Sequence, residues 1–392
     1  MNISLQKFFT LFVLLILGSM LLIISGCSNT EGSANSNESS SEQKVSSSSE
    51  QKISSNSNSL VNPDDYSGTD IEKLQQAFDV ASKNHENFVQ TKIILYREYD
   101  ITGGSIKFNI SDYTRTPIII TGFGGGFYKN DSGPMFTALQ RNTSEITFND
   151  VYFRSTSGKG TYISRGNALI NVNFNSCNFK QMDSIMIAKG TDEREFGSLG
   201  FIQNIHLNNC NIFEGDGNLF ECEAYYGLYL DGVTIENRSG DCILQTKQTG
   251  GNEYKSCYQV NITNCLIEGI KGNVASIYSS ESFNINGNYF EDNTGNIVVN
   301  SQNEIMGLNI SGNRLFNSSE INSPLVKISG TVYNVYSSGN HSNKELYNTD
   351  ELQNGNITSI NDISVSGKKF TKSLDGFTII DGSGKQASTD ND

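Results

Sequence analysis

The stretch IHLNNCNI at residues 205–212 decides the fold, because its pattern recurs along the chain. Aliphatic residues occupy its first, third and eighth positions, and a small or polar residue occupies its sixth. Period-2 alternation is typical of half-buried strands, and the two polar residues in the middle predict a bend. The same pattern, with aliphatic or aromatic residues, begins at residues 146, 172, 228, 260, 283 and 308.

A second apolar segment follows each copy, as at 184–188 and 325–328, so we expect about three short strands in each repeat. One such unit cannot bury its apolar face alone. Stacking the units in parallel gives every strand a neighbour above and below, and encloses a continuous core. The sequence therefore predicts an all-β fold, a single-stranded parallel β-helix, or solenoid, of about eight or nine coils.

Parallel stacking places the sixth position of every copy in one column, with about 4.8 Å between rungs. This column contains Cys177, Cys210, Val233, Cys265, Asn288, Asn313 and Asn340. We expect its cysteines to fill the core as small apolar side chains. Its asparagines are expected to hydrogen-bond one another's amides from rung to rung. Disulfides between consecutive rungs stay open at this point.

The two ends of the solenoid have different sequences. Residues 69–83 predict a helix that caps the first coil, because Thr69 and Glu72 have the spacing of a capping box. Its apolar residues follow helical spacing: Ile71, Leu74, Ala77, Phe78 and Ala81. The repeat pattern is lost after residue 348. We therefore expect the β-helix over residues 63–348 and a partly disordered C-terminal extension over residues 349–392.

The N-terminus predicts export and lipid anchoring. Residues 1–26 carry one charged side chain, Lys7, ahead of an apolar run that is typical of a secretory signal peptide. The tetrapeptide ISGC at residues 24–27 resembles the bacterial lipobox, in which lipid is transferred to the cysteine and the signal is cleaved before it. The resemblance implies a diacylglyceryl group on Cys27, and two acyl chains suffice for stable anchoring. A membrane-spanning signal anchor is the alternative.

Residues 27–62 consist mainly of Ser, Asn, Glu, Gln and Lys. Such a segment cannot bury enough apolar surface to offset the entropy lost on ordering, so it predicts a disordered tether that begins at the lipidated Cys27. The predicted location is the extracytoplasmic face of the cell membrane. The membrane is then one partner, held through the lipid anchor.

The charge of the chain limits its other partners. The formal net charge is -14 at pH 7, which argues against binding to nucleic acid or to anionic lipid headgroups. The chain has only four prolines and no tryptophan, but it has 37 glycines, a composition that suits many short strands joined by tight turns. No stretch within the repeat region has the composition of a linker, so we expect a single domain.

Three further stretches resemble a known superfamily. Residues 65–81, DYSGTDIEKLQQAFDVA, are similar to the entry segment that caps the pectin-lyase-like right-handed β-helix proteins. Residues 92–101, KIILYREYDI, resemble the strand that follows this segment, and residues 117–124, PIIITGFG, resemble the next strand and turn. The resemblance covers roughly residues 64–345 and implies a right-handed coil. The superfamily includes pectate lyases, polygalacturonases and phage tailspikes, so the resemblance specifies the chemistry weakly.

The resemblance suggests Asp216 and Asp241 as catalytic residues. Polygalacturonase-like hydrolases carry aspartates in NTDG and GDDC stretches, which EGDG at residues 214–217 and SGDCI at residues 239–243 resemble. The two aspartates lie on successive predicted coils, which suits paired carboxylates about 5 to 9.5 Å apart. The family's histidine and Arg-x-Lys do not follow, so the catalytic set is incomplete. Ordinary turn aspartates are the competing interpretation.

Candidate ligand-binding residues follow on the same coil. Glu221 and Glu223 are additional acids that are candidates to bind Ca²⁺, as acids do in pectate lyases, although solvated strand acids are the simpler interpretation. No cofactor and no metal are otherwise predicted, because the three histidines are scattered along the chain. Tyr225 and Tyr226 lie near two predicted insertions, 190–200 and 247–258, and their rings are candidates to stack on sugars. Exposed turn tyrosines are again the alternative.

Taken together, these features predict a surface lipoprotein whose β-helix binds a polysaccharide or cell-wall glycan, with cleavage by a lyase or glycoside hydrolase mechanism as a further hypothesis. The alternative is a non-catalytic adhesin or structural protein that derives from such an enzyme. The two hypotheses differ in a checkable way, because catalysis requires acidic side chains that converge on a common groove.

Overall fold

The computed structural model describes residues 59–108, 116–138, 146–156, 161–166, 168–190, 199–249, 251, 253–255, 257–302, 304–360 and 362–364. The predicted signal peptide, Cys27 and the tether as far as residue 58 lie outside these residues, as do residues 365–392. The chain divides into two units, residues 1–53 and 54–392, and the fold described below belongs to the second. Among the described residues, no helix is long and apolar enough to cross a membrane.

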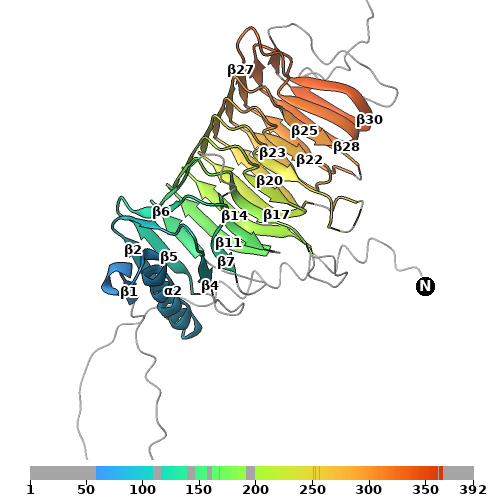
Figure 1. Cartoon of the computed structure of the whole chain (residues 1–392). Coiled ribbons are helices and arrows are strands. Elements are labelled where there is room, and N and C mark those ends of the chain that lie inside the picture. Colours follow the sequence, from blue (N-terminus) through green and yellow to red (C-terminus); the bar gives the residue numbers. More distant parts are fainter. Residues whose placement is uncertain are drawn as a thin grey trace, which may run out of the picture. The chain divides into compact units, whose positions relative to one another are not determined.

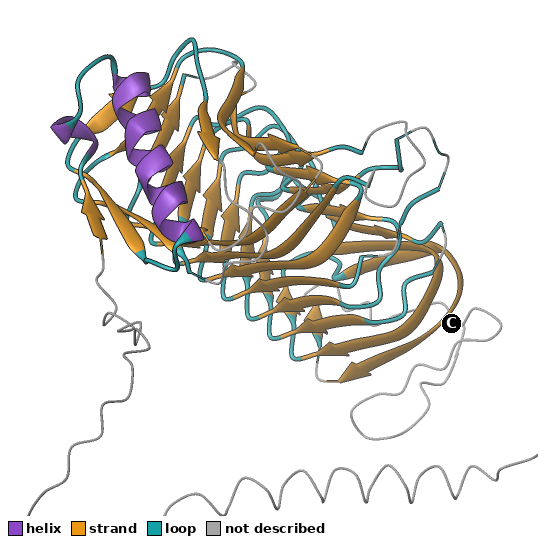
Figure 2. Ribbon diagram, turned by 90° about the horizontal axis from the view of Figure 1, so that it is seen from below, coloured by secondary structure: helices purple, strands orange, loops and turns teal. Residues whose placement is uncertain are grey.

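Three strands alternate along the chain and build a three-sided coil. In one representative coil the chain runs through β14, β15 and β16 and then enters β17, which pairs with β14 in parallel. Figures 1 and 2 show the coils stacked into one elongated solenoid. We call its three sides face A, face B and face C. The prediction of a parallel β-helix with about three strands per repeat is confirmed.

The strands of face A are β1 (Ser59–Val61), β2 (Thr91–Leu95), β5 (Ile118–Gly122), β8 (Ile146–Asn149), β11 (Ala168–Asn175), β14 (Phe201–Asn208), β17 (Ala224–Asp231), β20 (Gln259–Thr263), β23 (Phe283–Asn286) and β26 (Leu308–Ser311). Those of face B are β4 (Ile106–Phe108), β7 (Gly133–Ala138), β10 (Thr161–Gly166), β13 (Ser184–Ala188), β16 (Phe220–Cys222), β19 (Ile243–Gln245), β22 (Ala275–Ile277) and β25 (Ile297–Asn300). The long strands β28 (Val326–Ser338) and β30 (Tyr347–Ile360) run through both faces and join them into one 20-stranded sheet.

Face C is a separate 11-stranded sheet. It consists of β3 (Glu98–Asp100), β6 (Gly126–Lys129), β9 (Tyr152–Ser155), β12 (Asn178–Lys180), β15 (Asn211–Phe213), β18 (Thr234–Glu236), β21 (Leu266–Glu268), β24 (Tyr289–Glu291), β27 (Arg314–Phe316), β29 (His341–Ser342) and β31 (Ile363–Ser364). The 11 strands of face C outnumber the eight or nine coils that the sequence predicted. The difference arises because the first and last coils pair without the full repeat pattern. The ladder also starts before residue 63 and continues past residue 348, as far as Ser364.

A helix covers the N-terminal end of the solenoid. After the short 3-10 helix η1 (Pro63–Asp65), helix α2 spans Asp70–Glu86 and begins with a capping box between Thr69 and Glu72. Its predicted apolar face is buried except for Ile71, which is half-buried, and the Phe78 ring lies 5.8 Å from that of Phe136 on face B. Figure 2 shows the helix lying across the first strands. The predicted capping helix is confirmed. It shields the apolar interior that the end of the stack would otherwise expose.

The fifth position of the repeat turns the chain from face A to face C. The residues there have φ between 51° and 69°. Only glycine adopts this left-handed conformation without strain, although asparagine and aspartate tolerate it better than most residues. This requirement explains seven of the eight residues at the bend, Ser176 being the exception: Asp150, Asn209, Gly232, Asn264, Gly287, Gly312 and Gly339.

The predicted column at the sixth position is confirmed. In its second half Asn288 donates a side-chain hydrogen bond to Asn313 (3.0 Å), Asn313 donates to Asn340 (2.9 Å), and Asn340 donates to Asp362 (2.9 Å). In its first half, Cys177 and Cys210 are buried thiols that donate to carbonyls of the preceding coil. All six cysteines from Cys177 to Cys265 are free. Burial raises the pKa of the Cys265 thiol to about 12, so it stays protonated at neutral pH.

Candidate functional site

The predicted catalytic pair lies in the turns between face C and face B. Asp216 is exposed, and Asp241 is half-buried. Phe220 pairs with Ile243, so the residue in register with Asp241 is Asn218 rather than Asp216. The two aspartates therefore occupy different rows of the turn.

The Asp241 carboxylate serves as one rung of a turn ladder. It accepts hydrogen bonds from the Asn273 backbone (2.7 Å) and the Ser276 hydroxyl (2.9 Å), and the Asp241 backbone donates to the Asn218 side chain (3.0 Å). The Asn273 side chain accepts from the Asn296 backbone in the same way (3.4 Å). Because asparagines fill the equivalent positions in neighbouring coils, the geometry gives Asp241 the role of a turn residue.

The carboxylate of Glu223 is buried, with 1% of the residue exposed, and it ties both insertions to the coil. It accepts hydrogen bonds from the backbone of Gly190 (3.0 Å), Gly200 (2.8 Å) and Thr249 (2.8 Å). Glu223 is therefore an anchor for the loops and is not available to a ligand. The interpretation of Glu223 as a ligand-binding strand acid is wrong, because the alternation of the strand is interrupted at this corner.

Glu221 stays on the outer side of face B. Its carboxylate forms an ion pair with Lys189 (2.8 Å) and accepts a hydrogen bond from the Asn218 amide (3.0 Å). Burial alone would raise the pKa of Glu221, but the bonds from Lys189 and Asn218 more than offset it and leave the pKa below its ordinary value. Among the described residues, no group of three His, Cys, Asp or Glu side chains is placed to hold a metal ion.

Tyr225 belongs to the core. It is completely buried, and its hydroxyl donates to the carbonyl of Leu244 (2.8 Å). Burial raises the pKa of Tyr225 well above its ordinary value. The prediction that the Tyr225 ring contacts a sugar is wrong, because the residue pairs with Ile202 on the inward side of face A.

Tyr226, the next residue, points outward and belongs to a set of stacked rings. Its ring lies 5.0 Å from that of Tyr258 in a stacked arrangement and 5.3 Å from that of Phe201, edge to face. Tyr258 is 50% exposed. At the same corner between faces B and A, Tyr254 stacks on Tyr278 at 4.3 Å. We call these five residues the aromatic strip.

Basic and neutral polar groups border the aromatic strip. The Lys247 ammonium lies 5.6 Å from the centre of the Tyr254 ring. Farther along face A, His206 stacks on Tyr229 at 4.3 Å, and the Tyr229 hydroxyl donates to the Gln259 side chain (2.9 Å). Burial lowers the pKa of His206, so its imidazole is neutral at pH 7.

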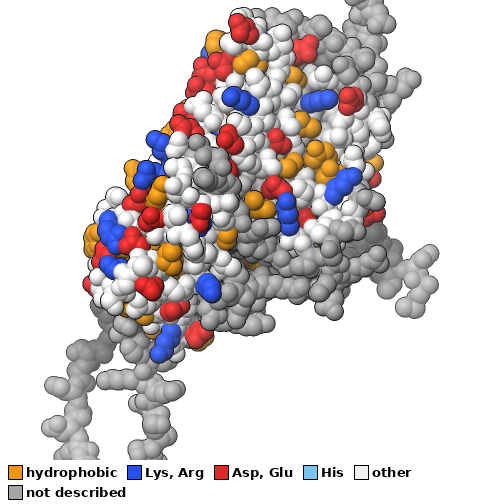
Figure 3. Space-filling model, viewed as in Figure 1, with side chains coloured by type: hydrophobic (Ala, Val, Ile, Leu, Met, Phe, Trp, Pro, Cys, Tyr) orange, Lys and Arg blue, Asp and Glu red, His pale blue; other side chains and the backbone are white. Residues whose placement is uncertain are grey.

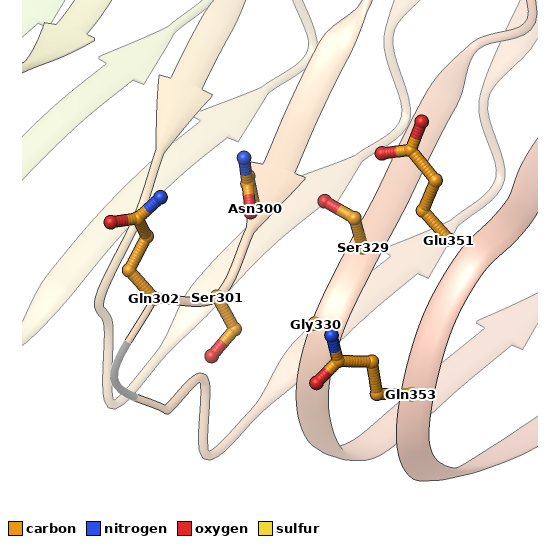
Figure 4. Close-up of a pocket in the computed structure, with 7 residues that line it drawn as sticks. All are labelled: Asn300, Ser301, Gln302, Ser329, Gly330, Glu351 and Gln353. Atoms are coloured by element: carbon orange, nitrogen blue, oxygen red, sulfur yellow. The ribbon is translucent and has the colours of Figure 1, made fainter.

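A polar hollow of about 610 Å³ continues this corner toward the C-terminal end. Its lining residues, drawn in Figure 4, are Asn300, Ser301, Gln302, Ser329, Gly330, Glu351 and Gln353. Ile277 pairs with Val299, so Tyr278 and Asn300 follow as neighbours on adjacent coils. The Gln302 backbone also donates to the carbonyl of Tyr278 (3.2 Å). The hollow therefore adjoins the aromatic strip.

The sequence pointed to only part of this site. Of the predicted ligand-binding residues, the structure brings only Tyr226 into the aromatic strip. Tyr254 and Tyr258 lie in the insertion at residues 247–258, which was expected to build a binding face. Two tyrosines in one insertion could therefore have indicated the aromatic strip. Tyr278 and the hollow carried no comparable signal, because their neighbours come from other coils.

Face C carries a column of acids. Glu236, Glu268 and Glu291 are adjacent in register on β18, β21 and β24. Acidic side chains gather along the edge of Figure 3 at which Figure 1 places β6 and β27. Partial burial raises the pKa of Glu268, and the like charges of Glu291, Glu236 and Asp292 raise it further.

We expect Glu268→Gln to raise the free energy of unfolding at pH 7 by a few tenths of a kcal/mol, because it removes like charges that lie opposite one another. The raised pKa means that ionised Glu268 costs stability above that pKa and costs none once protonated. The gain should therefore disappear near pH 3 and weaken in high salt. Urea unfolding at both pH values measures it. Glu98→Gln is the control and should lower stability, because Glu98 pairs with Arg154 (2.6 Å).

Two solved structures resemble this fold. The tailspike protein of Acinetobacter baumannii phage AM24 superposes with a TM-score of 0.55 at 14% identity, over 80% of this chain and 55% of the tailspike. The chain thus spans about half of that protein. The Streptococcus pneumoniae surface protein and adhesin PfbA gives a TM-score of 0.38 at 12% identity, over 82% of this chain and 96% of PfbA. No protein-family model and no curated protein sequence matches the chain.

Proposed function

We propose, from its parallel β-helix fold, that this chain is a surface protein that binds a polysaccharide through the aromatic strip. The observation that carries the proposal is the exposed face of Tyr258, which stacks on Tyr226 beside the Tyr254–Tyr278 stack. Aromatic rings offer flat apolar faces with polar tips, which suit the C–H face and hydroxyl rim of a sugar. A tyrosine that is already stacked loses little side-chain entropy on binding.

The binding face follows the axis of the solenoid. Phe201, Tyr226, Tyr258 and Tyr278 lie at successive corners between faces B and A, and neighbouring coils are about 4.8 Å apart. A row of rings along a solenoid suits an extended linear polymer better than a compact small molecule. The shared fold of the phage tailspike is compatible with this proposal and does not specify the ligand.

We propose that the face is displayed outside the cell. The lipobox-like sequence at Cys27 supports a lipid anchor, and the Ser- and Asn-rich residues that follow support a flexible tether. Such an arrangement places the domain within reach of cell-wall or extracellular glycans. Metabolic labelling with a palmitate analogue tests the anchor, and Cys27→Ala should abolish the label.

Binding without cleavage accounts for the acidic residues better than glycosidase chemistry does. Asp241 is held in a turn ladder, and Glu223 is held by three backbone amides. A paired-carboxylate mechanism needs two acids that face one sugar from a common groove. Unsaturated or shortened products from a glycan panel, lost in Asp216→Asn or Asp241→Asn, would instead favour the lyase or hydrolase hypothesis.

We expect Tyr258→Ala to weaken binding to the glycan that the full chain binds best by about tenfold, since truncating an aromatic contact at an interface costs about 1–2 kcal/mol. Isothermal titration of the full chain in detergent against a panel of neutral and uronic glycans measures this. Tyr152→Ala is the matched control, because Tyr152 is 49% exposed on face C. Equal affinity of both variants and the wild type would overturn the proposal.

A further inference from the structure

The polar hollow lies where the solenoid departs from its regular register. The pairing of β28 with β30 shifts between Lys327 and Ser329 and again between Gly330 and Thr331. Such bulges re-aim side chains and are frequent next to functional sites. Gly330 has φ +74°, and a Cβ there would lie 2.2 Å from the carbonyl oxygen of Ser301. Only glycine fits, so the floor of the hollow has no side chain at this point.

Neutral polar groups line the hollow. Asn300, Gln302 and Gln353 contribute amides, and Ser301 and Ser329 contribute hydroxyls (Figure 4). The Ser301 hydroxyl is buried and has no hydrogen-bond partner among the residues that the structure describes. A buried polar group without a partner carries a cost that a bound polar ligand or an ordered water removes.

The charges at the hollow balance each other. Glu351 is the only charged residue among the lining residues, and its carboxylate lies 3.5 Å from the Lys327 ammonium. No lining residue supplies a cation for a carboxylate or sulfate on a ligand. The net charge of the chain, -14, also disfavours an anionic polymer. The chemistry therefore suits hydroxyl groups, which both donate and accept hydrogen bonds.

We infer that the polar hollow is a second subsite for the same glycan, and that it takes an uncharged, hydroxyl-rich sugar unit while other units of the chain stack on the aromatic strip. This inference rests on the proposed function. Tyr258 and Glu351 belong to corners four coils apart, a span of about 19 Å at the spacing of parallel strands. A long glycan reaches both parts, whereas a short one reaches only one of them. Joining two weak sites in this way raises the affinity without new contacts.

The test compares glycan length and charge. The probes are a length series of neutral gluco-oligosaccharides, a matched series of oligogalacturonates, and the polysaccharide that the wild-type chain binds best. Asn300→Ala should weaken binding of the long neutral ligand about fivefold and leave that of the shortest binding oligosaccharide unchanged. Tyr258→Ala should weaken both. Asn309→Ala is the control, because Asn309 lies on face A of the next coil, and an unchanged thermal unfolding midpoint shows that each variant is folded.

Each outcome separates the two proposals. If Tyr258→Ala loses affinity for the long ligand and Asn300→Ala does not, the second subsite is wrong and the proposed function stands. If galacturonates bind more tightly than neutral chains of the same length, the assignment to uncharged sugars is wrong. If the wild-type chain binds none of the glycans, or Tyr258→Ala has no effect, the proposed function itself fails.

Discussion

Asn313→Leu should lower the free energy of unfolding by about 3–5 kcal/mol, because it removes four hydrogen bonds from the interior at once. The Asn313 amide oxygen accepts from the backbone (3.0 Å) and the side chain (3.0 Å) of Asn288. Its amide nitrogen donates to the carbonyl of Ile285 (2.8 Å) and to the side chain of Asn340 (2.9 Å). Leucine has a similar volume but satisfies none of these groups, and the site is 1% exposed, so water cannot replace them.

Equilibrium unfolding in guanidinium chloride, followed by circular dichroism, measures this loss. The matched control is Asn309→Leu, because Asn309 lies on the outward side of β26 in the same coil. We expect that change to stay within about 0.5 kcal/mol. Should the Asn313 variant unfold at the wild-type midpoint, the buried amide column would contribute nothing to stability, and the explanation of the column given above would be wrong.

The second large effect is expected from Gly295→Ala. Glycines at 217, 240, 272 and 295 stack at the turn before face B, and a Cβ on Gly295 would lie 1.7 Å from the carbonyl oxygen of Gly272. None of the four has a positive φ, so the constraint is the close approach of one coil to the next rather than a left-handed backbone. Because the obstacle is backbone, the turn must move as a whole. We expect a loss of about 3 kcal/mol.

Comparing the thermal or denaturant unfolding of Gly295→Ala with that of Gly251→Ala isolates the effect of the close approach between coils. A Cβ at Gly251 meets only ordinary contacts, the nearest at 3.5 Å. The Gly251 change should be neutral or slightly stabilising, since alanine restricts the unfolded chain more than glycine does. A similar loss in both variants would show that the turn tolerates a methyl group and that the glycine column is incidental.

The parts of the fold that depend on local patterns were predictable. Alternation along each strand predicted the inward residues, and the periodicity of Leu74, Ala77 and Phe78 predicted the buried side of the capping helix. The column that runs through Asn288 and Asn313 followed from the repeat alone, because parallel stacking puts equivalent positions of successive coils next to each other.

The prediction of the site was less successful at corners. Cys222, Glu223, Ala224 and Tyr225 are all buried, so alternation fails where the chain leaves face B and enters face A. A single change of phase turned Tyr225 inward and left Tyr226 outward. Resemblance to hydrolases directed attention to Asp241, although its coil neighbours at the same position are asparagines. The hydrogen bonds of the turn cannot be read from the sequence. They show that Asp241 is a structural residue of the turn.

By itself, the sequence determined that this chain is a parallel solenoid with a capping helix and amide and thiol columns, because these features arise from short repeats and their period. Only the tertiary structure decided which side chains meet outside the core. Tyr254 meets Tyr278, and Asn300, Ser329 and Glu351 form one row, because stacking brings distant segments into register. The bulges that open the polar hollow depend on how β28 pairs with β30, and such pairing is a property of two coils together.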